Sequence, residues 1–147
     1  MSGKPQTDKP LTVADYPLAE NRPDVVETKT GRTLDDITLE GVLSDSVKLE
    51  DLRITERELR QQAEIARAAG RPTLAANFER GAELVDVPQD VIMRVYELLR
   101  PGRASSKDEL IAVARDLRET YGAQGVAAFI EEAADVYERR SLYKKRF

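Results

Sequence analysis

Apolar side chains repeat at helical spacing through much of the chain, most clearly over residues 51–84. Thr55 and Glu58 form a capping-box pattern that predicts the start of a helix, and good helix formers follow it. Gly70 is suited to end that helix, and Pro72 to open the next one. The second helix has one apolar face, so this stretch predicts an antiparallel helical hairpin.

Three further helices are predicted after the hairpin. The first opens at Pro88 and is stopped by Pro101. Ser106 and Glu109 repeat the capping-box pattern at the start of the next helix, which two glycines separate from the last one. The predicted fold class is therefore all-α, with about five main helices in a helical domain over residues 33–147.

Short, irregular elements are predicted just before the hairpin. Thr33 with Asp36 forms a local cap pattern, and Thr38 is suited to cap a short helix over Leu39–Leu43. A further turn is expected over Leu49–Leu52. Helices this short are marginal by themselves, so we expect their order to depend on docking.

Residues 1–32 differ from the rest because they contain four of the seven prolines, and proline interrupts both helices and sheets. For residues 1–10 the composition predicts a disordered tail. From Leu11 onward apolar residues recur, which favours an extended arm anchored by Tyr16 and Leu18 on another surface. That surface could belong to the same chain or to a partner.

The chain has no His and no Cys, which narrows the possible chemistry more than any motif does. The usual general base, the commonest metal ligand and every thiolate nucleophile are therefore missing. Adjacent acids such as Glu131 and Glu132 are typical of solvated helix faces in a chain with 34% charged residues. We predict no catalytic, cofactor-binding or metal-binding residue in this chain.

The net charge of −4 argues against a general nucleic-acid binder, and no apolar run is long enough to span a membrane. The first residues lack a signal-peptide pattern, so we expect a cytoplasmic protein. Basic residues do gather at the end of the chain: Arg139, Arg140, Lys144, Lys145 and Arg146. They are suited to complement the dipole of the last helix. The alternative is a stand-alone helical adaptor or regulatory protein that uses this basic tail.

Asn77, Phe78 and Arg80 form an unusual cluster inside the second hairpin helix. In one interpretation Arg80 pairs with Glu83 on a solvent-exposed face and Asn77 points to water. In the other the cluster contacts a partner, because arginine and aromatic residues are typical interface anchors. The residues alone leave both open.

Several short motifs stand out along the chain: VADYPLA (Val13–Ala19), TLDDITLEGVLS (Thr33–Ser44), DLRIT (Asp51–Thr55), LAANFERGAEL (Leu74–Leu84), VPQD (Val87–Asp90) and LRP (Leu99–Pro101). Together they resemble the small subunit of adenosylcobalamin-dependent diol and glycerol dehydratases. The resemblance implies a non-catalytic subunit of a lyase that converts 1,2-propanediol or glycerol to an aldehyde and water by radical chemistry. It does not separate the two substrates.

The resemblance also implies partners. In this family the substrate site lies in a large subunit, and adenosylcobalamin lies between the large and medium subunits. The small subunit docks on the large one in a dimer of heterotrimers, and no catalytic residue is assigned to it. Our candidates for the subunit interface are Tyr16, Leu18, Arg53, Asn77, Phe78 and Arg80.

Small subunits from microcompartment operons often carry an amphipathic helix before the DYPLA motif. Here that region is polar and interrupted by Pro5 and Pro10. We therefore expect that any enclosure in a bacterial microcompartment depends on the other subunits.

Overall fold

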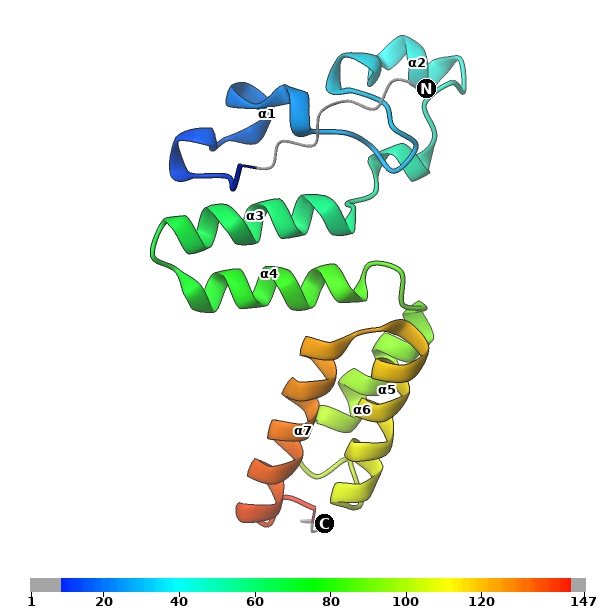
Figure 1. Cartoon of the computed structure of the whole chain (residues 1–147). Helices are drawn as coiled ribbons and strands as arrows, with labels where there is room; N and C mark the ends of the chain where they lie inside the picture. Colours follow the sequence, from blue (N-terminus) through cyan, green and yellow to red (C-terminus); the bar gives the residue numbers. More distant parts are fainter. Residues whose placement is uncertain (1–8, 144–147) are drawn as a thin grey trace. The chain divides into compact units, whose positions relative to one another are not determined.

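The structure is a computed structural model that describes residues 9–143 (Figure 1). The predicted disordered tail falls almost entirely outside these residues, as does the basic cluster beyond residue 143. The chain divides into two compact units, Met1–Ala82 and Glu83–Phe147. The division into an arm over residues 1–32 and a helical domain over residues 33–147 stays a prediction.

The all-α prediction is confirmed, because the described residues contain seven α-helices and no strand. The five long helices, α3 to α7, correspond to the five main helices that were predicted. The α-helices are α1 (Leu18–Asn21), α2 (Leu39–Leu43), α3 (Glu56–Ala68), α4 (Pro72–Leu84), α5 (Gln89–Leu99), α6 (Lys107–Tyr121) and α7 (Gln124–Arg139). Short 3-10 helices span Val13–Asp15, Pro23–Val25, Leu34–Asp36 and Leu49–Leu52.

Helices α3 and α4 form the predicted antiparallel hairpin (Figure 1). The Thr55 hydroxyl accepts a hydrogen bond from the Glu58 amide at 3.2 Å, and the Glu58 carboxylate accepts one from the Thr55 amide at 2.9 Å. Gly70 has a φ of 72°, the left-handed conformation that favours glycine at the end of a helix. Three small buried residues, Ala63, Ala66 and Ala75, pack together where the helices meet.

The second unit is built on the pairing of α6 and α7. Buried side chains of α6 recur at helical spacing and meet those of α7. Leu110, Leu117 and Ile130 are the largest fully buried side chains among the described residues. Arg118 of α6 donates two hydrogen bonds to Glu131 of α7, at 2.7 and 2.8 Å. This unit therefore buries most of its large apolar side chains against itself.

The start of α7 is capped by a residue far away in the sequence. The Glu83 carboxylate, at the end of α4, accepts hydrogen bonds from the amides of Gly125 and Val126, both at 2.8 Å. The N-cap residue, Ala123, has no side chain that could do this. A negative charge at this position also complements the helix dipole.

Candidate docking surface

The N-terminal arm packs on helix α3 of its own chain. Leu11, Leu18 and Val25 are buried and form one cluster with Ile65 of α3. The Leu11 amide donates a hydrogen bond to the carboxylate of Glu64 at 3.0 Å, which holds the start of the arm on the same helix. The surface that anchors this part of the arm is thus intramolecular, an alternative that the sequence left open.

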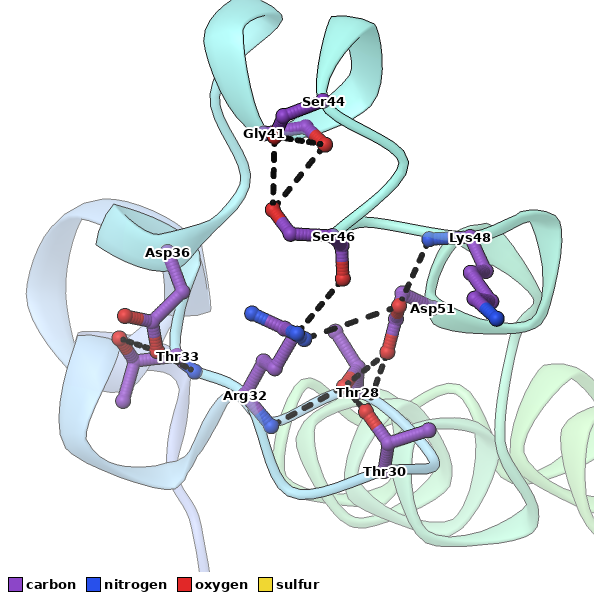
Figure 2. A network of polar contacts seen from close by, with 10 residues as sticks. All are labelled: Thr28, Thr30, Arg32, Thr33, Asp36, Gly41, Ser44, Ser46, Lys48 and Asp51. Atoms are coloured by element: carbon purple, nitrogen blue, oxygen red, sulfur yellow. Dashed lines mark hydrogen bonds and ion pairs between the residues drawn. The ribbon is translucent and has the colours of Figure 1, made fainter.

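A buried carboxylate, that of Asp51, organises the turn that follows the arm (Figure 2). Asp51 is only 7% exposed. It accepts hydrogen bonds from the Lys48 amide at 2.9 Å and from the hydroxyls of Thr28 and Thr30, and Arg32 lies 3.8 Å away. The Lys48 amide, then the two hydroxyls and Arg32, hold the pKa of Asp51 below its ordinary value. The group is therefore a structural anion rather than a proton donor.

The same network continues from Arg32 to the short helix α2 (Figure 2). Arg32 donates a hydrogen bond to the carbonyl of Ser46 at 2.6 Å, and the Ser44 and Ser46 hydroxyls donate to the carbonyl of Gly41. A Cβ atom at Gly41 would lie 2.8 Å from a methyl group of Val47, so the close packing requires glycine there. Polar contacts thus hold in place elements that bury few residues of their own.

Most of the exposed large apolar side chains belong to the arm and to the short elements that this polar network holds. Among the described residues, nine of twelve such side chains lie between residues 13 and 54, with exposures of 40% to 78%. They are Val13, Tyr16, Leu34, Leu39, Val42, Leu43, Leu49, Leu52 and Ile54. Contiguous exposed apolar patches mark surfaces that other proteins cover, so these nine side chains are candidates for such a surface. We refer to this region as segment 13–54.

The structure brings three of the six interface candidates together. Tyr16, Leu18 and Arg53 line one groove between the arm and the start of α3. Tyr16 and Arg53 are exposed, whereas Leu18 is buried in the core of the first unit and contacts its own chain.

The other three candidates lie on α4. Asn77 is exposed, Phe78 packs half-buried against the alanine cluster, and Arg80 donates a hydrogen bond to the Asn77 side chain. Glu83, the partner expected in the solvent-face interpretation, uses both carboxylate oxygens to cap α7. A role of the six residues in an interface stays a prediction.

Two polar residues that the sequence did not single out, Asp51 and Gln61, are buried in the described part of the first unit. A signal for Asp51 was present in the stretch TKTGRT (28–33), which offers hydroxyls and a cation around a turn. Gln61 had no such signal, because its position on the inner face of α3 depends on where the arm packs.

The described residues offer little else of a functional kind. They contain no group of three or more His, Cys, Asp or Glu residues that could hold a metal ion. None of the helices found among them is long and apolar enough to cross a membrane. Taken together, the fold and the exposed segment define a small helical protein with the features of a docking subunit.

Comparison with known proteins identifies the family. The family model for the dehydratase small subunit matches residues 11–144. The chain is 55% identical over 132 residues to the propanediol dehydratase small subunit of Citrobacter freundii, covering 90% of this chain and 76% of the relative. It is 52% identical over 138 residues to that of Salmonella typhimurium, covering 94% and 79%. The chain belongs to the dehydratase small subunit family.

The buried carboxylate leads to a prediction about pH. Because the pKa of Asp51 is lower in the folded chain, its charge contributes stability that is present above the ordinary value of 3.8 and is lost as the pH falls through the folded-state value. We expect Asp51→Asn to lower the melting temperature at pH 7, with a difference from the wild type that shrinks below pH 3.8. Thermal unfolding of both proteins, from pH 7 to below pH 3.8, measures this difference in melting temperature.

Asp35→Asn is the matched control, because Asp35 is an exposed acid in the same unit. It should melt like the wild type at pH 7. A variant of Asp51 that melts like the wild type at pH 7, or a difference that grows in acid, would contradict the role given to this carboxylate.

Proposed function

We propose that this chain is the non-catalytic small subunit of a heteromeric adenosylcobalamin-dependent dehydratase, which converts 1,2-propanediol or glycerol to the aldehyde and water. Its family membership and the names of its relatives support this proposal. The structural observation that carries it is the set of nine large apolar side chains exposed on segment 13–54. These side chains are suited to be covered by the large subunit, so the chain would stabilise the assembly.

The partners in this proposal are a large and a medium dehydratase subunit, assembled as a dimer of heterotrimers. The cofactor belongs to the assembled enzyme, and we assign it no residue of this chain, which has no histidine to offer a metal. We place the assembly in the cytoplasm.

The free energy of association favours a surface that combines apolar area with specific polar contacts. Burying the exposed parts of the nine side chains would contribute on the order of 10 kcal/mol. Losing translational and rotational freedom on association costs about 4–15 kcal/mol, which is a similar amount. The apolar side chains would therefore offset the cost of association, and the polar contacts around them would set the specificity.

A stand-alone adaptor that uses the basic tail is not favoured, because the family match points to a dehydratase subunit instead. Arg139 lies in the last turn of α7, where its charge complements the helix dipole. That position accounts for part of the basic cluster without any nucleic-acid partner.

The proposal predicts the outcome of reconstitution. The isolated chain should show no dehydratase activity toward 1,2-propanediol or glycerol. Added to the large and medium subunits with adenosylcobalamin, it should restore activity or lengthen its half-life. Full turnover and full stability from the large and medium subunits alone would contradict a structural role.

A pair of tyrosine variants tests the place of contact. Tyr16 and Tyr96 are equally exposed, at 59% and 58%, but only Tyr16 lies on segment 13–54. We expect Tyr16→Ala to weaken association by about 1–3 kcal/mol, because aromatic anchors dominate interfaces, and Tyr96→Ala to leave it unchanged.

Arg80→Ala should also weaken association without slowing the radical step. Native mass spectrometry of the complex, with kcat measured at saturating subunit, separates the two effects.

If Tyr16→Ala and Arg80→Ala, alone and combined, both assembled like the wild type, the interface assignment of these residues would be wrong. The reconstitution result would still stand in that case, since it does not depend on which residues make the contact.

A further inference from the structure

The groove between the arm and α3 has an apolar lining that continues onto segment 13–54. It encloses about 520 Å³ and is formed entirely by residues of the first unit. Its apolar lining includes Tyr16, Leu34, Ile37, Leu52 and Ile54. All of these except Ile37 are among the exposed side chains of segment 13–54. A partner that covers the segment would therefore also meet the groove.

The charged side chains of the groove leave one cation without a partner. Glu27 forms an ion pair with an arginine of α3, and Arg32 is held by Asp51 and by a carbonyl of the chain. Glu58 caps α3. Arg53 is different, because its guanidinium makes no hydrogen bond or ion pair with any other residue in the part of the chain that the structure describes. The Arg53 guanidinium is therefore suited to pair with one negative charge of a partner.

A buried side-chain amide in the lining also has a hydrogen-bond acceptor that no described residue uses. Gln61 is 8% exposed, and its Nε2 donates a hydrogen bond to the carbonyl of Val25 at 3.3 Å. That bond fixes the orientation of the amide, because a carbonyl oxygen can only accept. The Oε1 atom on the other side is buried and has no hydrogen-bond partner within residues 9–143. This atom has almost no accessible surface, so the groove lining must shift before an N–H or O–H donor can reach the atom and stabilise it.

We propose that this groove receives a segment of the large subunit that has apolar side chains and one Asp or Glu. The carboxylate pairs with Arg53, and the apolar side chains of the segment pack on Leu52 and Ile54. Docking shifts the groove lining at Gln61, so that an N–H of the segment reaches Oε1 and donates a hydrogen bond to it. Arg53 and Gln61 then select the partner, while the apolar lining supplies the contact area. This inference rests on the proposed function and specifies where and how the docking occurs.

Charge reversal at Arg53 tests the proposal with a close control. Arg53→Glu should raise the Kd for the complex of large and medium subunits by about tenfold to a hundredfold, because it replaces a charge-assisted pair with repulsion. Arg53→Lys should recover part of the affinity. Arg71→Glu is the control, since Arg71 is an exposed arginine of the same unit in the α3–α4 connection, and its Kd should equal that of the wild type.

Gln61→Met tests the second contact without relying on charge. It removes the acceptor, and with it the Nε2 donor that bonds the Val25 carbonyl, while keeping a side chain of similar length, so it should raise the Kd severalfold. Melting of the free chain checks that the fold survives. A photo-crosslinking residue placed at Ile54 of the wild-type chain then captures the segment itself, and the crosslinked peptide should come from the large subunit and contain Asp or Glu.

The outcomes separate this inference from the proposed function. A wild-type chain that does not bind the other subunits would remove the proposed function and the inference with it. If the wild type binds but Arg53→Glu and Gln61→Met bind equally well, the chain is still a subunit and the groove assignment is wrong. A crosslink to the medium subunit, or to a peptide without an acidic residue, would also overturn the assignment.

Discussion

The buried carboxylate of Asp51 is the constraint on which the first unit depends. Its partners come from Thr28, Thr30, Arg32 and Lys48, so one side chain fixes a turn, a loop and the entry to α3. Short helices bury little apolar surface and are marginal by themselves. Because polar contacts hold these elements together, their apolar side chains do not have to form a core and are left on the outside.

The two units use their apolar residues in different ways. In the second unit, Leu110, Leu117 and Ile130 are fully buried, and the helices α6 and α7 meet along regular apolar faces. In the first unit the interior consists of small side chains and a few residues of the arm, whereas nine large apolar side chains are exposed. A subunit of a stable complex needs such an exposed surface, since association must offset its own entropic cost.

The sequence predicts the structure correctly where the signal is local. The caps at Thr38 and Thr55 depend on residues three positions away, and both lie in the structure where they were predicted. It could not place contacts between distant residues. The partners of Asp51 include hydroxyls 21 and 23 residues away, and Glu83 caps a helix 42 residues further on. Leu18 shows the same limit, because periodicity predicts an anchor without showing which surface it contacts.

We propose that segment 13–54, with its exposed apolar side chains, meets the large subunit. Hydrogen–deuterium exchange of the free chain and of the assembled enzyme tests this contact most directly. Assembly should slow exchange over residues 13–54, with little change over α6 (Lys107–Tyr121). Slower exchange confined to α6 and α7, with residues 13–54 exchanging as in the free chain, would contradict it.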